Sequence, residues 1–326
     1  MSLLILLPTT VKLILLCFFL TLYEQFTWAR ISSQDELPEQ EFFRLLMRTN
    51  GIERELDVIT LEDGSTVRIK DVVQHSFKGL MVQRYAAIKL GTHSSAKLQL
   101  PNRLSNDSID TSKWKIDKTY IIPNSYYNYM IDAIFRSDGV RMSRDSTAKV
   151  LSIGLGGGTI DGFLHAVFPK MDITVVEISP VMVNMARKWF GLSENYNYRV
   201  KIADGVDFLA EKANSREMYD VILLDACLSD QVVGIVCPYK TFLNVDVLEN
   251  ISKLIHPRGI FVINALSMSM APDALYDYLA KRFHIFFNYC GRLYRRTAVN
   301  QVIYCMHRMP TSTPHTNIMR FLNETV

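Results

Sequence analysis

The sequence of 326 residues is 48% hydrophobic and 21% charged, which is typical of a globular protein and argues against long disordered segments. A formal net charge of +3 provides no strong basic field, so nucleic acid is not expected as the main partner. Five cysteines in a chain of this length argue against a disulfide-dense scaffold, and no C-x-x-C or H-E-x-x-H spacing supports a metal site. The length fits one large α/β domain and a smaller module.

Residues 1–29 have the features of a secretory signal. An apolar run at 13–23 follows Lys12, and small residues occupy the −3 and −1 positions of a cleavage site after Ala29. A second apolar stretch at 3–7 makes a membrane anchor the alternative, although a lysine near mid-membrane is unfavourable. The sequence therefore predicts a secreted or secretory-pathway protein. Membrane association through this segment is one alternative, and a cytoplasmic protein is the other.

Cleavage after Ala29 would remove Cys17 and leave four cysteines, which are Cys227, Cys237, Cys290 and Cys305. An even number permits disulfides in an oxidising lumen, and four buried thiols explain the same residues at least as well. The sequence leaves both interpretations open.

Residues 30–118 predict a small β-rich module that ends in a linker. A helix signal at 42–46 precedes a hairpin whose Asp63-Gly64 turn is typical of type I′. Further strands are expected at 72–77, 80–90 and 97–100, and the polar, turn-rich residues 101–118 indicate the linker.

Residues 119–310 predict an α/β domain in which apolar strands alternate with amphipathic helices. Such alternation implies a parallel sheet with helices on both faces, and a closing pair of strands implies an antiparallel last strand. The expected strands are 150–153, 173–176, 200–203, 221–224, 260–264, 284–289 and 299–306, with a turn at Gly291 between the last two. The expected helices are 123–135, 159–168, 180–190, 206–213, 242–255 and 272–282. Residues 311–326 are expected to form a C-terminal tail.

The first strand of this domain runs into a glycine-rich loop at 154–158 (GLGGG), and a helix follows. Glycines there let a ligand approach the backbone closely and leave the first N–H groups of the helix free to bind it. A dinucleotide fingerprint would need another glycine at the position of Thr159, so an NAD site is disfavoured.

Three acidic residues follow at the ends of successive strands. Glu177 ends the second strand, Asp204 the third and Asp225 the fourth, and open α/β sheets bind ligands at these carboxyl ends. The Glu177 carboxylate can accept hydrogen bonds from ribose hydroxyls, and Asp204 can accept one from an adenine amino group. Each alone could be a loop carboxylate or a helix cap, but three in succession after a glycine-rich loop favour a ligand site.

Together these motifs resemble a class I S-adenosylmethionine-dependent methyltransferase, which implies a Rossmann-like sheet with an antiparallel last strand. Within that class the sequence is similar to the spermidine-synthase-like branch, and to the C-terminal domain of methyltransferase-like protein 13 in particular. The resemblance covers about the last two-thirds of the mature chain. The matching stretches include IGLGGG (153–158), VEISPVM (176–182), KWFGL (188–192), VKIADGVDFLA (200–210), YDVILLDA (219–226) and LIHPRGIFVIN (254–264).

The resemblance implies S-adenosyl-L-methionine as the cofactor and a protein or small amine as the methyl acceptor. It implies that Gly154, Gly156 and Gly158 line the methionine end of the cofactor, Glu177 its ribose and Asp204 its adenine. Related domains methylate the N-terminus and a lysine of the elongation factor that delivers aminoacyl-tRNA. In the synthase relatives, a β-rich module shapes the acceptor site or a homodimer interface.

Two other functions stay open. An aminopropyltransferase of the same branch would need a second acid shortly after Asp225, where the sequence continues Ala226-Cys227-Leu228-Ser229 before Asp230. A secreted, non-enzymatic protein on the same scaffold would fit the N-terminal signal, but the intact glycines and acids argue against it.

Asp225 is the predicted catalytic residue and also a predicted cofactor-site residue. It ends the strand beside the reactive end of the ligand, where it could orient an incoming amine or accept its proton. Tyr126 and Tyr127 are weaker candidates for the substrate wall, since packing against the sheet explains them better. Cys227 has no histidine placed nearby in the sequence to suggest a Cys–His nucleophile.

Overall fold

The computed structural model describes residues 36–76, 79–88, 91–215, 217–228, 234–295, 299–311 and 317–325. The predicted leader at 1–29 and Asp230 lie outside these ranges. Within them, no helix is both long and apolar enough to span a membrane.

The chain divides into two compact units. The first comprises the residues up to Ile52 together with Val73–Met81 and Leu100–Trp114, and the second comprises Glu53–Val72, Val82–Gln99 and Lys115–Val326. All the residues that the sequence singles out for chemistry belong to the second unit.

Helix α2 (Glu39–Asn50) organises the first unit. Its apolar side chains lie on one side, where Phe42 and Leu46 are buried, and the Phe42 ring stacks on Trp114 with ring centroids 6.2 Å apart. The helix predicted around 42–46 is therefore confirmed. The predicted linker contains two short 3-10 turns, Asn106–Ser108 and Thr111–Lys113.

The predicted β-rich module is an antiparallel sheet with the strand order β1-β2-β3-β4. Its strands are β1 (Glu53–Thr60), β2 (Thr66–Ser76), β3 (Gly79–Ile88) and β4 (Gly91–Lys97). The separate strands predicted at 72–77 and 97–100 are wrong, because the first belongs to β2 and β4 ends where the second should begin.

A buried ion pair explains why β2 continues through its charged residues. Asp71 accepts hydrogen bonds from Arg84 Nε at 2.8 Å and from Nη2 at 2.9 Å, and both side chains are buried. Paired in this way, Asp71 keeps the alternation of inward residues that Val67, Ile69 and Val73 establish.

The turn between β1 and β2 also differs from the prediction. A type I′ turn needs positive φ at both central residues, but in this turn only Gly64 has one, at +82°. Asp63 instead accepts a hydrogen bond from the Ser65 N–H at 2.8 Å, and the Gly64 N–H donates to the Leu61 carbonyl at 3.0 Å. The loop is therefore longer than two residues and uses a single left-handed glycine.

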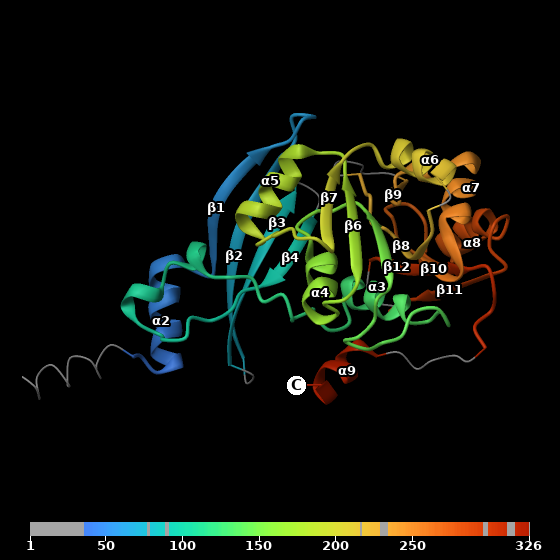
Figure 1. Ribbon diagram of the computed structural model, residues 1–326. Helices are drawn as coiled ribbons and strands as arrows, with labels where there is room; N and C mark the ends of the chain where they lie inside the picture. The colour runs from blue at the N-terminus through green and yellow to red at the C-terminus, as the bar shows by residue number, and fades with distance from the viewer. Residues whose placement is uncertain are drawn as a thin grey trace, which may run out of the picture. The chain divides into compact units, whose positions relative to one another are not determined.

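The second unit contains the predicted parallel sheet with an antiparallel end, so the α/β, Rossmann-like fold is confirmed (Figure 1). The strand order is β11-β12-β10-β8-β5-β6-β7, with the short β9 paired to β10. The strands are β5 (Lys149–Ile153), β6 (Asp172–Glu177), β7 (Tyr198–Ile202), β8 (Tyr219–Leu224), β9 (Ile235–Cys237), β10 (Ile255–Ser267), β11 (Tyr289–Leu293) and β12 (Gln301–Met306). Strand β12 runs antiparallel to β10, and β11 antiparallel to β12.

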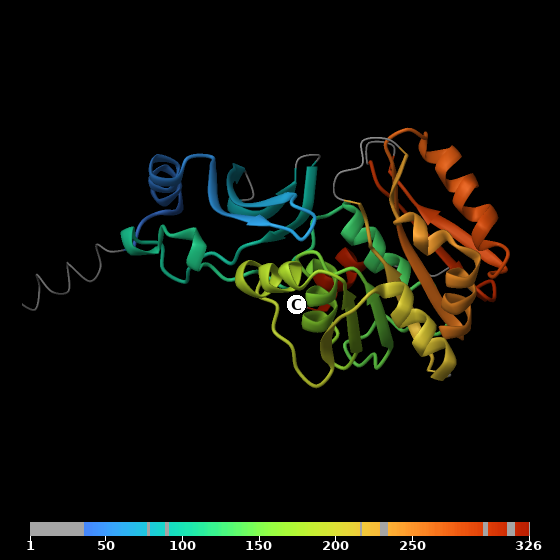
Figure 2. The same cartoon turned by 90° about the horizontal axis from the view of Figure 1, so that it is seen from above.

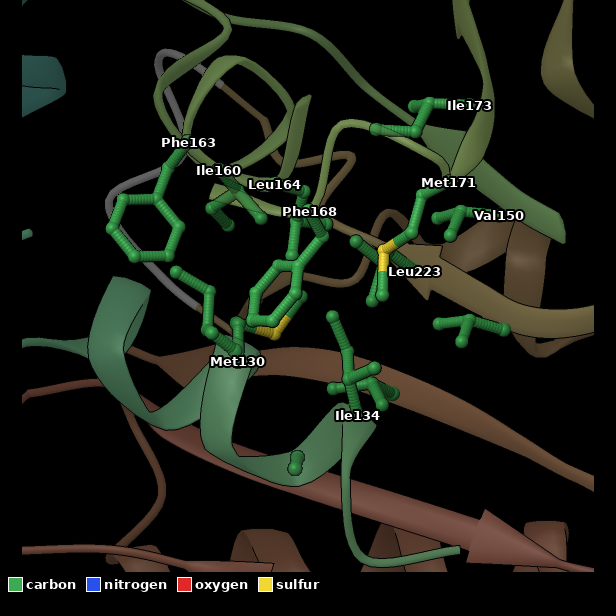
Figure 3. Close-up of a cluster of buried hydrophobic side chains, with 14 of the residues drawn as sticks. Met130, Ile134, Val150, Ile160, Phe163, Leu164, Phe168, Met171, Ile173 and Leu223 are labelled. Atoms are coloured by element: carbon green, nitrogen blue, oxygen red, sulfur yellow. The ribbon is translucent and has the colours of Figure 1, made fainter. Parts of the chain in front are cut away.

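Helices cover both faces of this sheet (Figures 1 and 2). One face packs against α3 (Tyr126–Ile134), α4 (Thr159–Val167), α5 (Pro180–Trp189) and α9 (Ile318–Thr325). The other packs against α6 (Gly205–Ser215), α7 (Val245–Leu254) and α8 (Pro272–Phe283), and the 3-10 turn Lys240–Leu243 precedes α7. Successive strand residues alternate between the two cores, as Val150 and Leu151 do. Figure 3 shows part of the first core, where Met130 and Ile134 meet Phe163 and Phe168.

The C-terminal part holds one wrong prediction and one unexpected element. The strand predicted at 284–289 is β11, which begins only at Tyr289, and Gly291 lies inside it opposite Tyr304 rather than in a turn. A side chain at this glycine would meet the Tyr304 ring at 2.5 Å, so the strand needs glycine for close packing. Helix α9 falls in the predicted tail, and its first residue Ile318 is fully buried.

The four cysteines form two disulfides, Cys227–Cys237 and Cys290–Cys305. Cys290 and Cys305 face each other directly on β11 and β12. Of the two interpretations that the sequence leaves open, the structure therefore has the disulfides.

Candidate functional site

A cavity of about 380 Å³ lies within the second unit, at the carboxyl ends of β5, β8 and β10. It is lined by residues of the glycine loop, of α3 and of β4. This is the edge of an open α/β sheet where ligands bind, as the sequence predicts.

The glycine loop is shaped by close backbone contacts. Gly154 has a φ of +94°, and a side chain there would lie 2.6 Å from the Asp225 carbonyl oxygen. Gly156 has a φ of +53°, and a side chain there would lie 2.7 Å from Ser94 Oγ. Both glycines line the cavity, whereas Gly158 does not line it and caps the N-terminus of α4 with a φ of +69°.

Strand β4 packs directly on the glycine loop. Ser94 Oγ accepts a hydrogen bond from the Gly157 N–H at 2.7 Å, and Thr159 Oγ1 donates to the Ser95 carbonyl at 3.0 Å. His93 of the same strand lines the cavity, where burial lowers its pKa and the Glu177 carboxylate opposes that shift. The β-rich module thus contributes part of the cavity wall.

Glu177 is hydrogen-bonded to the glycine loop. It ends β6, is only 8% exposed, and accepts hydrogen bonds from the Leu155 and Ser179 N–H groups, each at 2.9 Å. It does not line the cavity. Each carboxylate oxygen has a second lone pair, so the predicted bonds to ribose hydroxyls are compatible with this arrangement.

Asp204 also lies outside the cavity lining, at an exposed position. Its Oδ1 accepts hydrogen bonds from the Val206 N–H at 2.7 Å and the Asp207 N–H at 3.4 Å, which caps helix α6. The residue therefore has a structural role in addition to its predicted adenine contact.

Asp225 lines the cavity and has two side-chain donors. Asn264 Nδ2 donates to Oδ1 at 2.7 Å, and the Tyr126 hydroxyl donates to Oδ2 at 3.4 Å. Asn300 Nδ2 donates in turn to Asn264 Oδ1 at 2.8 Å, which fixes the orientation of the Asn264 amide. Burial raises the pKa of Asp225 to about 6, although the two donors oppose the shift. The carboxyl can therefore exchange a proton near neutral pH.

A second acid, Asp161, lines the same cavity from α4. It is 2% exposed, and its Oδ1 has no hydrogen-bond partner among the described residues. Burial raises the pKa of Asp161 to about 7; the Ser152 hydroxyl opposes this rise and the Asp225 charge adds to it. Lys118 interacts with the Asp161 carboxylate, and burial lowers the pKa of this lysine to about 8.

The mouth of the cavity carries apolar side chains. Met268 is 51% exposed and Val299 is 70% exposed, and both belong to the cavity lining. Leu228, Val236 and Leu266 continue this apolar wall inward. An acceptor that reaches Asp225 from this side must pass apolar surface before it meets a carboxylate.

The structure brings together Gly154, Gly156, Asp225 and the two tyrosines of α3, all of which line the cavity. Tyr126 contacts Asp225, and the Tyr127 hydroxyl accepts a hydrogen bond from the Ser95 N–H at 3.1 Å. Sequence reasoning missed five cavity residues, which are His93, Ser94, Asp161, Asn264 and Asn300. The strand-end pattern could have found Asn264 near the end of β10; the others had no local signal.

Comparisons with known proteins place the sequence in one family. The spermine/spermidine synthase domain model matches residues 137–308, which is more than half of the chain. The sequence is 31% identical over 193 residues to the eEF1A lysine and N-terminal methyltransferase homolog of Drosophila melanogaster, covering 59% of this chain and 28% of that protein. The chain thus spans less than a third of the length of the first curated relatives it matches.

Two solved structures resemble the fold. Human methyltransferase-like protein 13, solved in complex with SAH, is 27% identical with a TM-score of 0.53 and covers 61% of this chain and 89% of its own. A probable spermidine synthase from Corynebacterium glutamicum ATCC 13032 is 14% identical with a TM-score of 0.54 and covers 83% of this chain and 85% of its own. The second likeness is one of fold alone.

Proposed function

We propose that this chain, which belongs to the spermine/spermidine synthase domain family, is an S-adenosylmethionine-dependent methyltransferase that acts on an amine. One observation carries the proposal: Asp225, with its raised pKa, and the glycine loop line one cavity. Relatives named as methyltransferases and a related structure solved with SAH support it.

The residues around the glycine loop fit the cofactor. Side chains at Gly154 and Gly156 would collide with Asp225 and Ser94, so glycine is needed for the packing of the loop, and both glycines line the cavity where the methionine end would lie. Glu177 has lone pairs for the ribose, and Asp204 stands at the next strand end for the adenine. When bound, S-adenosylmethionine supplies a methyl group on a positively charged sulfonium.

Asp225 would prepare the acceptor. An amine reacts only as the neutral base, so its ammonium form must first lose a proton. A carboxyl with a pKa of about 6 is ionised at neutral pH and can accept that proton, while Tyr126 and Asn264 hold it in place. Most of the rate would then come from holding the amine in line with the methyl group.

We propose that the acceptor is a protein amine. The first relatives are named eEF1A lysine and N-terminal methyltransferases, and this name is the reason to test eEF1A first. The apolar mouth formed by Met268 and Val299 supports an acceptor with apolar surface around its amine.

Aminopropyl transfer is the second candidate, and one observation favours it. The family's second acid after Asp225 is missing from its usual place, and Asp230 lies outside the described residues. Asp161 nevertheless gives the cavity a second carboxyl from a different element, and a diamine needs two. The third candidate, a non-enzymatic protein, is disfavoured by the intact glycines and acids.

The test is a methyl-transfer assay on the purified chain. Methyl-labelled S-adenosylmethionine and recombinant eEF1A are incubated with the wild type and with Asp225→Asn, and mass spectrometry locates any methylated amine. A parallel reaction contains decarboxylated S-adenosylmethionine and putrescine. Label on eEF1A with the wild type alone supports the proposal, whereas aminopropyl product without methyl transfer would replace it with the second candidate.

We also propose that residues 1–29 direct the chain into the secretory pathway. The two disulfides support this, because disulfides persist mainly in oxidising compartments. Retention of the segment as a membrane anchor is the alternative to cleavage, and a homodimer is a separate proposal that light scattering tests. In the cell, a secreted enzyme would have to meet an acceptor other than a cytosolic elongation factor.

N-terminal sequencing and light scattering on the protein from a eukaryotic host test these proposals. A chain that begins at Arg30 supports cleavage. An intact Met1 or Ser2 on cytosolic protein contradicts it and makes eEF1A an accessible acceptor.

A further inference from the structure

The Cys227–Cys237 disulfide lies against the proposed catalytic carboxylate. Both cysteines line the cavity, and Cys227 follows Asp225 by two residues. Its Sγ lies 3.8 Å from Asp225 Oδ1 and 3.6 Å from Asn264 Nδ2, the amide that donates to the same oxygen.

A disulfide sulfur carries no hydrogen, so this contact donates nothing to Asp225. The sulfur instead covers one side of the carboxylate with apolar surface and leaves Asn264 and Tyr126 as its side-chain donors in the described cavity. Fewer donors and less water make a carboxylate a stronger base, in agreement with the raised pKa of Asp225.

The same bridge joins the segment after β8, which carries Asp225, to β9 beside the strand that carries Asn264. Cys237 is on β9, which pairs with β10 at Leu266, two residues beyond Asn264. The chain after β8 is fastened to this region by a hydrogen bond from the Tyr239 N–H to the Ala226 carbonyl at 2.8 Å. The disulfide, the β9–β10 pairing and this hydrogen bond therefore link the segments on both sides of the Asp225–Asn264 hydrogen bond.

We propose that the Cys227–Cys237 disulfide is a positioning element of the acceptor site, and that its reduction slows methyl transfer while leaving cofactor affinity unchanged. This inference rests on the proposed function. A dithiol reductant would act by exchange: it gives two electrons and two protons to the sulfur pair, becomes a cyclic disulfide, and leaves two thiols on the chain.

Reduction changes the surroundings of Asp225 in two ways. A thiol at Cys227 can donate a hydrogen bond to the carboxylate, which stabilises the charged form and lowers its pKa. The lost covalent link also frees the acceptor wall to move, and small misplacements near reacting atoms have large effects on rate.

Other titratable groups in the cavity must be separated from this effect. They are Tyr126 and Tyr127 on α3, Asp161 on α4 and His93 on β4. The pKa of Asp161 is raised to about 7 and that of His93 is lowered from 6.5, so both groups titrate close to Asp225 and a measurement must observe the Asp225 carboxyl itself.

The experiment is a carbon-13 NMR titration of aspartate-labelled full chain, with the Asp225 signal assigned by its absence in Asp225→Asn. It is performed in the Cys290→Ala/Cys305→Ala background, where Cys227–Cys237 is the only disulfide left in the part of the chain that the structure describes. The Cys290–Cys305 bridge, which does not line the cavity, provides the matched control: it is left in place and reduced in a chain that lacks Cys227–Cys237.

We expect reduction to lower the pKa of Asp225 by about one unit. Cys227→Ser/Cys237→Ser, which places hydroxyl donors at these positions, should reproduce that shift. Cys227→Ala/Cys237→Ala removes the link without adding a donor and should leave the pKa near its oxidised value. Both pairs should slow methyl transfer to eEF1A by about 10- to 100-fold, with cofactor affinity within a few-fold.

An unchanged Asp225 pKa on reduction, or equal shifts in the Ser and Ala pairs, would overturn the inference. So would a parallel loss of cofactor affinity, because the bridge would then support the fold in general. If no form of the chain methylates eEF1A, the acceptor proposal fails. The titration still decides whether the disulfide determines the pKa of the Asp225 carboxyl.

Discussion

On the glycine-loop side, defined by the cavity residues Gly154 and Gly156 together with Glu177 outside the lining, the contacts are made by backbone groups and by one carboxylate that accepts hydrogen bonds from two backbone N–H groups. On the Asp225 side, defined by Asp225, Asn264 and Tyr126, they are made by side chains from three separate elements. The first side is one short loop whose N–H groups donate to Glu177 and Ser94. The second depends on how α3, the residue after β8 and β10 pack together.

This difference matches the two tasks of a group-transfer site. A common cofactor needs a fixed cradle, which a short loop at a helix N-terminus provides. An acceptor needs a carboxyl whose pKa is adjusted by its surroundings, and only side chains brought from distant parts of the chain can adjust it. Binding and chemistry should therefore be separable by mutation.

The strongest way to break the comparison is Asp225→Asn. Asparagine keeps the size and one acceptor oxygen but cannot take a proton, so methyl transfer should fall by about 10²- to 10⁴-fold. Cofactor affinity, measured by calorimetry, should stay within a few-fold. Transfer at the wild-type rate would make Asp225 structural, and a collapse of cofactor binding would move it to the glycine-loop side.

Asp161→Asn tests whether ionisation of Asp161, the buried acid near Asp225, destabilises the folded chain. The pKa of Asp161 is about 7 in the folded chain and 3.8 in a model peptide, so wild-type stability should be full below pH 4 and fall as pH rises through 7. The variant lacks this loss. Its free energy of unfolding should exceed that of the wild type by a few kcal/mol at pH 8, at most about 4, and by little at pH 4.

Denaturant unfolding at the two pH values measures this difference. Asp145→Asn is a matched control, since Asp145 is exposed and its pKa is lowered by Lys170. The same difference in the free energy of unfolding at both pH values would contradict the raised pKa of Asp161.

Glu177→Ala sharpens the other side of the comparison. The loss of charge-assisted bonds to the ribose should weaken S-adenosylmethionine binding by about 1–3 kcal/mol. The Leu155 and Ser179 N–H groups also lose their acceptor, so the loop should become less protected from hydrogen exchange. Unchanged affinity in a folded variant would remove Glu177 from the cofactor site.

Asp204→Ala should have the smallest effect. The loss of the cap on α6 should lower the free energy of unfolding by about 1 kcal/mol. A thermal melt and a cofactor titration on the same sample separate the two roles. A loss of stability without any loss of affinity would leave Asp204 as a cap only.

The glycine loop and the acids at the strand ends can be located from the sequence because their signals are short-range, although Gly158, Glu177 and Asp204 do not line the cavity. Three successive strand ends carry acids, and the glycines stand together in one loop, so local spacing is enough to place them. Asn264 and Tyr126 meet Asp225 only through sheet order and helix packing, which no local pattern specifies. The cysteine pairs likewise depend on which strands are neighbours, a question that counting cysteines leaves open.

The wrong predictions have physical causes of the same kind. The strand predicted to begin at 72 is part of β2, because Arg84 pairs with Asp71 inside the fold and the strand continues through this acid. Gly291 looked like a turn but gives room to the Tyr304 ring across the strand pair. In both cases a partner far along the sequence decided the local structure.

Calorimetric titration of the purified chain with S-adenosylmethionine, its decarboxylated analogue and NAD tests the central claim most directly. If the glycine-loop side is a methyltransferase cradle, S-adenosylmethionine should bind, the decarboxylated analogue should bind more weakly, and NAD should give no heat of binding. Tighter binding of the decarboxylated analogue would indicate aminopropyl transfer. No binding of S-adenosylmethionine to the folded chain would contradict the account.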